Sequence, residues 1–143
     1  MILDALQKVC TAQQITADAV SVSSIDFGNV TPKRKVAVGE PMGYLVAISA
    51  KGTTTGSSKI QAIESAASAL TSPQIIGELD LAAADHVVGK AFVIACGHGI
   101  PALRYGGLNF DITGTVDYTV DAYFGPLSML AEQAETYAKN YDV

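Results

Sequence analysis

Two histidines and two cysteines carry the side chains best suited to nucleophilic or metal chemistry. Cys96 and His98 stand two positions apart, a spacing that places side chains on one face of a strand and suggests a nucleophile with its base. The glycine between them favours a turn, and no third residue is present to orient the imidazole. His98 is therefore interpreted as a polar turn residue.

His86 and Cys10 belong to no short pattern of Cys, His, Asp or Glu of the kind that binds zinc or performs redox chemistry. Cys10 and Cys96 are far apart in the chain, so both are interpreted as buried or half-buried residues. We therefore predict no catalytic residue and no metal site.

Carboxylates form the next group of candidates. Glu78 and Asp80 would share one face of a strand, where a pair of carboxylates can perform acid–base chemistry or bind calcium. No ligand loop of Asp, Asn and Gly surrounds them, so a solvated strand face is favoured. Asp117 and Asp121 flank Thr119 in the same way. Together these carboxylates predict an acidic surface, which suits a basic protein partner better than a substrate.

Segment 51–59 superficially resembles a phosphate-binding loop because it contains two glycines, threonines and serines, and a lysine. Three residues separate the glycines where such a loop has four, and Lys59 does not follow Gly56 directly. We interpret the segment as a flexible hairpin tip. The one basic cluster, Lys33, Arg34 and Lys35, is either a contact for an anion or an acidic partner or, as we favour, a solvated turn.

The element that organises the chain is a charge-free strand at residues 44–50, which follows a turn at residues 38–41. A strand without charge is usually covered on both faces, so we place it at the centre of a sheet. Seven further strands are predicted from alternation and β-branched residues, although the alanine-rich stretch 62–70 leaves a helix open as the alternative. The eight ranges are 19–26, 35–38, 44–50, 59–64, 74–81, 90–96, 102–112 and 115–124.

About eight strands without regular alternation of strand and helix predict an all-β fold, an antiparallel two-sheet sandwich of the jelly-roll kind. Residues 1–18 are expected to form an N-terminal arm, residues 19–125 the sandwich, and residues 126–143 a helical or extended C-terminal tail. The apolar residues of the tail fall at three- and four-residue steps, the pattern of one helix stripe. Such a short helix needs a surface on which to lie.

Composition favours association with protein. The 143 residues suit one domain, and 49% of them are apolar whereas 16% are charged, against about 25% in an average soluble domain. The net charge of −5 has the wrong sign for a nucleic-acid partner. No apolar run reaches the roughly 20 residues of a membrane span, and the first residues do not form a secretory signal, so we expect no membrane partner.

Short motifs in this order resemble the cement, or decoration, proteins of tailed-bacteriophage capsids, of the Bordetella-phage type. The similarity covers nearly the whole chain as far as Phe124. The motifs that carry it are Met1-Ile2-Leu3-Asp4, Ile15-Thr16, Ile25-Asp26-Phe27-Gly28, Val38-Gly39-Glu40-Pro41, Ser72-Pro73, Ile76-Gly77, Gly89-Lys90 and residues 105–108.

The resemblance implies a jelly-roll subunit that binds the outer face of an assembled shell of major capsid protein and bridges neighbouring subunits. It implies no enzyme activity and no cofactor, and a place on the outer capsid surface of a virion after synthesis in the host bacterial cytoplasm. We also expect self-association as a homodimer or homotrimer. The candidate partner-binding residues are Ile2, Leu3, Leu6, Lys33, Arg34, Lys35, Leu127, Leu130, Tyr137 and Tyr141.

A carbohydrate- or receptor-binding β-sandwich is the alternative, because jelly rolls often carry lectin sites. Sugar platforms use exposed aromatic rings, and the chain has no Trp and only 7% aromatic residues. An enzyme of the cupin kind ranks third, since two separated histidines do not supply its metal ligands.

Overall fold

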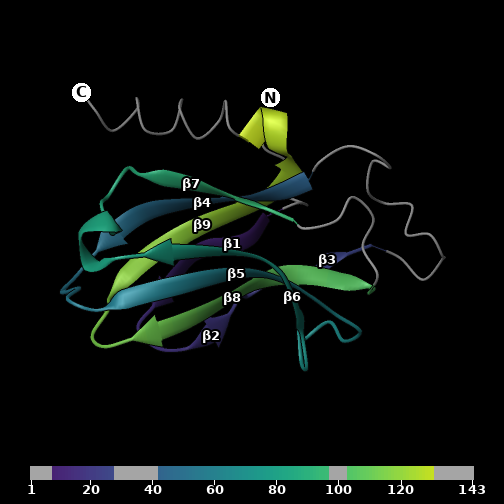
Figure 1. Cartoon of the computed structure of the whole chain (residues 1–143), viewed down its shortest axis with the longest axis horizontal. Coiled ribbons are helices and arrows are strands. Elements are labelled where there is room, and N and C mark those ends of the chain that lie inside the picture. Colours follow the sequence, from purple (N-terminus) through teal and green to yellow (C-terminus); the bar gives the residue numbers. More distant parts are fainter. Residues whose placement is uncertain (1–7, 28–41, 97–102, 131–143) are drawn as a thin grey trace.

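Nine β-strands form the described part of the chain, which comprises residues 8–27, 42–96 and 103–130 of a computed structural model (Figure 1). A 3₁₀ turn, η2, and a helical turn at residues 127–130 accompany them. The elements are β1 (Lys8–Ile15), β2 (Ala19–Val20), β3 (Ile25–Asp26), β4 (Met42–Lys51), β5 (Ser57–Ser65), β6 (Gln74–Leu81), η2 (Ala83–Asp85), β7 (Ala91–Ala95), β8 (Tyr105–Thr113) and β9 (Tyr118–Pro126).

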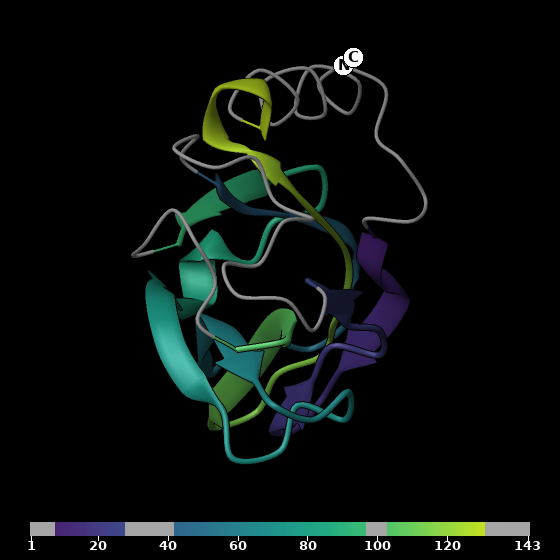
Figure 2. The same ribbon diagram turned by 90° about the vertical axis from the view of Figure 1, so that its right-hand side faces the viewer.

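The strands pair antiparallel in two sheets, which face each other around the core (Figure 2). Sheet A has the order β1-β9-β4-β7, and sheet B has the order β2-β8-β5-β6, with β3 also on β8. The pairs β1·β9, β2·β8, β4·β7 and β5·β6 are those of one long two-stranded ribbon. Rolling up this ribbon adds the pairs β4·β9 and β5·β8, which gives a jelly roll. The predicted all-β jelly-roll sandwich is confirmed.

Strand β4 lies in the interior of sheet A, between β9 and β7, as its lack of charge predicts. Tyr44, Val46 and Ile48 point into the core between the sheets. Leu45 and Ala47 alternate with them on the outer face of sheet A, and are also buried. Both faces of β4 are therefore covered, which explains why polar residues are excluded from it.

The N-terminal arm predicted over residues 1–18 is wrong in its second half. Lys8–Ile15 is strand β1, which pairs with β9 along the edge of sheet A. Its register shifts between Lys8 and Cys10 and again between Cys10 and Gln13, and Ala12 has a φ of 45°. These bulges remove the alternation by which a strand is recognised in a sequence, and they also protect an edge strand from further pairing.

The strand predicted over residues 19–26 is interrupted. Ala19–Val20 and Ile25–Asp26 both pair with β8, but the residues between them leave the ladder. Ser21 replaces the ladder there, because its backbone N–H donates to the Leu108 carbonyl (2.8 Å) and its hydroxyl accepts from the Leu108 N–H (3.2 Å). A serine side chain thus satisfies backbone groups that a regular strand would pair.

The hairpin tip predicted at residues 51–59 is also wrong, because β4 and β5 belong to different sheets. Residues 52–56 cross between the sheets and bind the loop before β9. The Gly52 N–H donates to the Asp117 carbonyl (2.7 Å), and the Thr54 hydroxyl bonds both the carbonyl and the N–H of Asp117 (3.0 and 3.1 Å). The partner lies 63 positions away, so local sequence cannot reveal that the loop is ordered.

The glycines of the strands have different roles. Gly77 marks a bulge as predicted, because the register of β5 and β6 shifts where Ile75 and Gly77 are the successive partners. Gly106 and Gly107 make no bulge, since β8 and β5 pair without a shift. A Cβ at Gly106 would collide with Phe27 inside the core, and a Cβ at Gly107 would collide with Leu70 on the outer face. The absence of a side chain at these two glycines leaves space for Phe27 on the inner face of sheet B and for Leu70 on its outer face.

The strand predicted over residues 74–81 is confirmed with the same bounds, and the other predicted strands in the described residues are confirmed with shifted ends. The range 59–64 lies in β5, so the helical alternative at residues 62–70 is excluded for its first part. The range 115–124 begins late, at Tyr118, and continues to Pro126. The strand predicted at residues 35–38 lies outside the described residues.

A substitution of Phe110 on β8 tests the packing of the core, because this side chain is fully buried between the sheets. The substitution Phe110→Ala is expected to lower the free energy of unfolding by about 3–5 kcal/mol, since it removes buried contacts and leaves a cavity. Urea denaturation measures the change. Ile75→Ala on β6 is the control, because Ile75 is 55% exposed, and it is expected to change stability by no more than about 0.5 kcal/mol. Equal losses in the two variants would contradict this core.

Candidate interaction surfaces

The outer face of sheet A is apolar along β4 and is partly covered by the chain itself. Leu45 and Ala47 of β4 are 1% and 0% exposed. After β9 the chain makes the helical turn 127–130, and the Leu127 side chain lies over Gly43. A Cβ at Gly43 would collide with Leu127, so the glycine provides the space in which this leucine sits. The start of the C-terminal segment therefore packs on sheet A.

Two of the predicted partner-binding residues belong to this turn. Leu130 is fully buried and Leu127 is half-buried within the single chain. Leu130 therefore offers no surface to a partner in this structure, and Leu127 offers part of its side chain. Met129 is 42% exposed and presents the free apolar side chain of the turn. The other predicted residues lie outside the described part of the structure: Ile2, Leu3, Leu6, Lys33, Arg34, Lys35, Tyr137 and Tyr141.

Asp117 and Asp121 do not form the acidic surface predicted for them. Asp121 accepts a hydrogen bond from the Ala12 N–H (2.9 Å) and forms an ion pair with Lys8 (3.2 Å). Asp117 accepts from the Gln14 side chain (2.9 Å). Both carboxylates therefore hold β1 against β9, and the irregular edge strand depends on them for bonds that its bulged backbone lacks.

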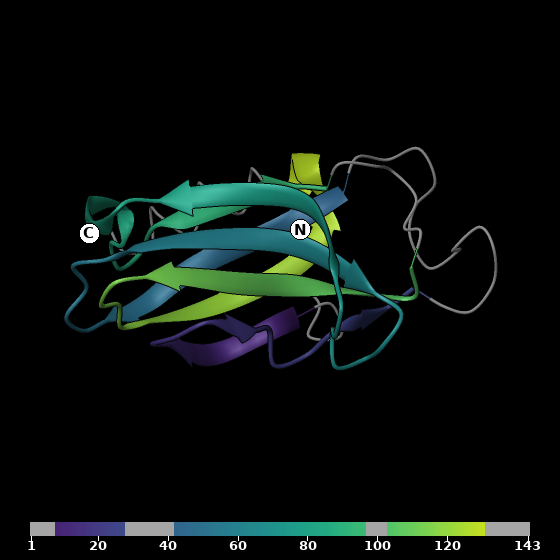
Figure 3. The ribbon, with the colours of Figure 1, turned by 60° about the horizontal axis from the view of Figure 1, so that its bottom comes forward.

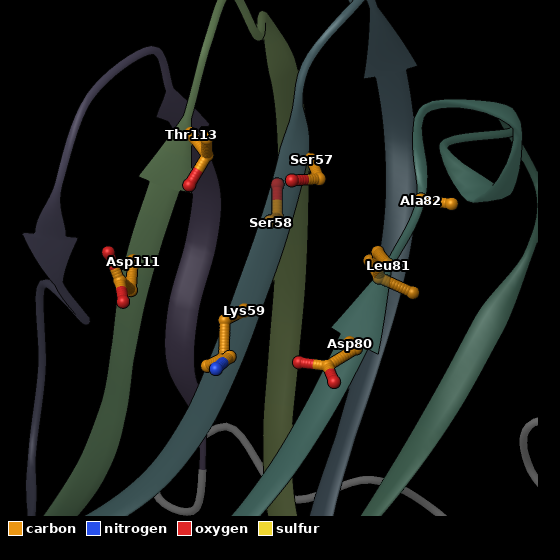
Figure 4. Close-up of a pocket in the computed structure, with 8 residues that line it drawn as sticks. All are labelled: Ser57, Ser58, Lys59, Asp80, Leu81, Ala82, Asp111 and Thr113. Atoms are coloured by element: carbon orange, nitrogen blue, oxygen red, sulfur yellow. The ribbon is translucent and has the colours of Figure 1, made fainter.

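The outer face of sheet B is polar along half of its length. Asp111, Lys59 and Asp80 form a row across β8, β5 and β6 (Figure 4). They line a shallow groove of about 430 Å³ together with Ser57 and Thr113. Asp80 is exposed, as is Glu78 one row further on, which confirms that this carboxylate pair occupies a solvated face.

In the next row of this face, the side chains of Asn109, Gln61 and Glu78 are joined by hydrogen bonds. The Asn109 amide donates to Gln61 (2.8 Å), and the Gln61 amide donates to Glu78 (3.2 Å). Lys59 pairs with Glu78 at 3.5 Å, which turns its charge away from Asp80. With both partners about 40% exposed, the ion pair contributes little to stability, and its effect is to order the row.

The opposite half of this face is covered by residues 66–72, which belong to the connection from β5 to β6 and which we call the strap. Figure 3 shows the strap passing in front of β8. Leu70 is 3% exposed and lies over Gly107. Ile63, the partner of Gly107 in the sheet, is fully buried although it points outward. The strap thus covers Gly107 and Ile63 on an otherwise polar face, and the Ser21 hydroxyl also lies over Gly107.

The backbone of the strap is strained. Leu70 has a φ of 60° and Ser72 a φ of 47°, in the left-handed region that side chains disfavour. Each such residue costs about 1–3 kcal/mol, whereas burying a leucine side chain contributes about 1.5–3 kcal/mol. Together the two strained residues cost about 2–6 kcal/mol, as much as or more than one buried leucine contributes, so the strap also depends on its hydrogen bonds to hold its place.

A serine and a histidine meet in the core at catalytic distance. The Ser58 hydroxyl and His86 Nε2 lie 2.9 Å apart, and His86 Nδ1 lies 3.3 Å from the Ala83 carbonyl oxygen. The His86 ring packs on Tyr118 with centroids 4.8 Å apart. Ser58 is 3% and His86 0% exposed, so no substrate reaches the hydroxyl in this structure. We interpret the pair as a buried polar link between β5 and η2, which no spacing in the sequence could reveal.

Within residues 8–27, 42–96 and 103–130, no three His, Cys, Asp or Glu side chains lie together in an arrangement that would hold a metal ion. No helix in that same part of the chain has the length and apolar character needed to cross a membrane. The hypothesis that Cys96 and His98 form a nucleophile with its base is not tested, because His98 lies outside the described residues.

Comparison with protein families shows to which family the chain belongs. Residues 9–122 match the model of the Bbp16 family, a Bordetella phage protein family. The chain belongs to the Bbp16 family. A comparison with curated proteins finds no match. The resemblance to proteins of the Bordetella-phage type is therefore confirmed at the level of the family.

The family match locates the shared part of this Bbp16 protein. It runs from β1 into β9 and so contains strands of both sheets, the strap and the groove. The helical turn at residues 127–130, with Leu127 on Gly43, lies beyond it. The matched region thus holds the sandwich, whereas the cover on sheet A comes from the unmatched end.

Alkaline pH is expected to destabilise this Bbp16 protein through its thiols. Burial raises the pKa of Cys10 and of Cys96 to about 12, from an ordinary value of 9.0. The folded state keeps protons that the unfolded state releases, so the stabilisation is complete below pH 9 and is lost as the pH rises toward about 12. Urea denaturation across this range measures the loss. The double variant Cys10→Ala/Cys96→Ala should lose less, and an equal slope in both proteins would refute the assignment.

Ser58→Ala tests the buried polar link. His86 would lose its partner for Nε2 while remaining buried, so the free energy of unfolding is expected to fall by about 1–3 kcal/mol. Thermal and urea denaturation measure the effect. Ser57→Ala is the matched control, because Ser57 is the exposed neighbour on β5, and it should change stability by less than about 0.5 kcal/mol. If Ser58→Ala were as neutral as the control, the link would carry no stability.

Proposed function

We propose that this Bbp16-family protein is a structural virion protein that binds the outside of a phage capsid and cements neighbouring major capsid protein subunits. One observation carries the proposal: the match to a Bordetella phage family covers the jelly roll from β1 into β9. In this proposal the protein performs no reaction and needs no cofactor. It is made in the host bacterial cytoplasm and resides on the outer capsid surface.

Rigidity supports this proposal, because a cement subunit must hold two capsid subunits at a fixed separation. At one end of the sandwich, residues 52–56 and the loop before β9 are bonded together, including Thr55 and Gly56 to the Thr115 carbonyl (2.9 and 2.8 Å). Along one side, a Cβ at Gly77 would collide with the Ala95 carbonyl, so β6 and β7 lie in close contact. A unit closed in these ways transmits load with little deformation.

Exposed aliphatic side chains supply surface for the partner. Among the described residues, five large apolar side chains are at least 42% exposed, and they occur on several separate elements. Single exposed apolar side chains are common on soluble proteins, so these five offer contact points for a partner but do not themselves indicate one. We propose the major capsid protein and further copies of this chain, as a dimer or trimer, as the partners. The five residues are Val22, Ile75, Val87, Val88 and Met129.

A carbohydrate- or receptor-binding sandwich remains the second candidate, and the groove on sheet B favours it. Asp80 and Asp111 with the hydroxyls of Ser57 and Thr113 present acceptors and donors that match sugar hydroxyls. No aromatic ring lines this groove, so it lacks the stacking surface on which sugar sites usually rely. A glycan array with the purified protein separates the candidates, since strong binding to one glycan would favour the second.

Reconstitution tests the cement proposal. Purified protein is added to capsid shells that lack it, and we expect added density on the outer surface together with raised resistance of the shells to heat. Both results follow because a bridging subunit adds contacts between shell subunits that must break before the shell opens. Cryo-electron microscopy and thermal scanning of the shells measure them, with lysozyme at the same concentration as the control. A monomer without affinity for the shells would refute the proposal.

A further inference from the structure

We propose that the outer edge of β7 is a surface for self-association, and that its occupant is β7 of a second copy of this chain, paired antiparallel about a two-fold axis. Sheet A of one copy then continues into sheet A of the other. Edge pairing about a two-fold axis joins two copies, so it selects a dimer over a trimer. The use of this dimer on a shell rests on the proposed function, whereas the pairing itself rests on the chain alone.

The backbone of β7, at the edge of sheet A, directs hydrogen-bonding groups away from the sheet (Figure 1). Lys90 and Cys96 flank the strand, and each bonds to the backbone of β4 at 3.0 Å. The register between β4 and β7 has no shift, so every second residue between these two bonds to β4 in the same way. Ala91 and Val93 therefore point their N–H and carbonyl groups outward, where no strand of the described residues pairs with them.

The other sheet edges among the described strands carry features that hinder pairing. Strand β1 has two register shifts and a positive φ at Ala12. Strand β6 has a register shift and carries Glu78 and Asp80, and β2 and β3 have two residues each. Strand β7 has five residues without charge, proline or register shift. Because proteins protect edge strands from unwanted pairing, an edge without such protection is expected to have a partner.

A second copy of β7 matches this edge in its hydrogen bonds. When Phe92 lies opposite Phe92 of the second copy, Ala91 of each copy exchanges both backbone hydrogen bonds with Val93 of the other. This register does not use the Ala95 carbonyl, which lies against Gly77 of β6. Residues near a two-fold axis meet their own copies, so a charge there would repel itself, and β7 has none.

The side chain of Phe92 supplies apolar contact for the pairing. It packs on the core but is only half-buried, and the Lys90 ammonium lies 5.7 Å from the centroid of its ring. In the proposed register the two Phe92 rings meet across the axis and bury surface that the single chain leaves open. The contact between two five-residue strands is smaller than the roughly 1,200 Å² of a standard interface, so the dimer is weak in solution. Neighbouring sites on a shell would strengthen it by raising the effective concentration.

Analytical ultracentrifugation of the full chain tests the edge. A reversible dimer with a Kd of about 10–100 μM is expected. Val93→Pro removes an outward N–H without removing a bond to β4, and it should raise the Kd at least about tenfold. Val93→Ala keeps the N–H and is the matched control, with a Kd within about twofold of the wild type. Ala91→Pro, at the first residue of the strand, repeats the test at a position where proline is tolerated.

A disulfide tests the register. In a background without the native thiols, Cys10→Ala/Cys96→Ala, the substitution Phe92→Cys places two thiols opposite each other across the axis, and oxidised glutathione should link them into a covalent dimer. Val93→Cys is the control, because Val93 faces Ala91 of the second copy, and it should link at least about fivefold more slowly. Non-reducing gel electrophoresis measures both. Faster linking by Val93→Cys than by Phe92→Cys would refute the proposed register.

The outcomes separate this inference from the proposed function. A protein that stays monomeric up to about 1 mM, that forms trimers, or whose dimer is as strong in both proline variants as in the wild type would overturn the pairing through β7. A dimer that both proline variants weaken but that binds no shell would support the pairing and overturn the cement proposal. Shell binding by a protein that never dimerises would do the reverse.

Discussion

Pairing between β4 and β9 is the interaction on which the rest of the structure depends. It brings residues 42–51 beside residues 118–126 in the interior of sheet A, and it is possible only because the ribbon of paired strands has rolled up. Tyr44 and Phe124 from the two strands then meet in the core with ring centroids 5.1 Å apart. Because β9 also pairs with β1, this contact sets the position of the irregular edge strand as well.

Burial on both faces of the sheets follows from this arrangement, and glycines make it possible. Leu127 covers sheet A over Gly43, and Leu70 covers sheet B over Gly107, so each outer face receives a leucine from a segment that turns back onto it. A side chain at either glycine would displace that leucine. The small domain thereby buries aliphatic surface outside its central core, which adds stability that two sheets alone would lack.

The surfaces that remain are divided by their chemistry. Sheet B presents ordered polar rows beside the strap, whereas the exposed aliphatic residues occur on several separate elements. The Ser58–His86 pair has the distance of a nucleophile and base but is sealed in the core, which shows why geometry without access is a poor guide to catalysis. The proposed function uses these surfaces for contacts with other proteins.

The sequence by itself determined the all-β class, most strand positions and the central place of the strand at residues 44–50, because alternation and the lack of charge are local properties. It also predicted that Glu78 and Asp80 share a solvated face. Only the tertiary structure decided that residues 8–15 are a strand, that residues 52–56 cross between sheets, and that Ser58 meets His86. These features depend on partners distant in the chain, and bulges or side-chain bonds replace the regular pattern there. No local signal records such a partner, so its effect becomes visible only once the sheets have packed.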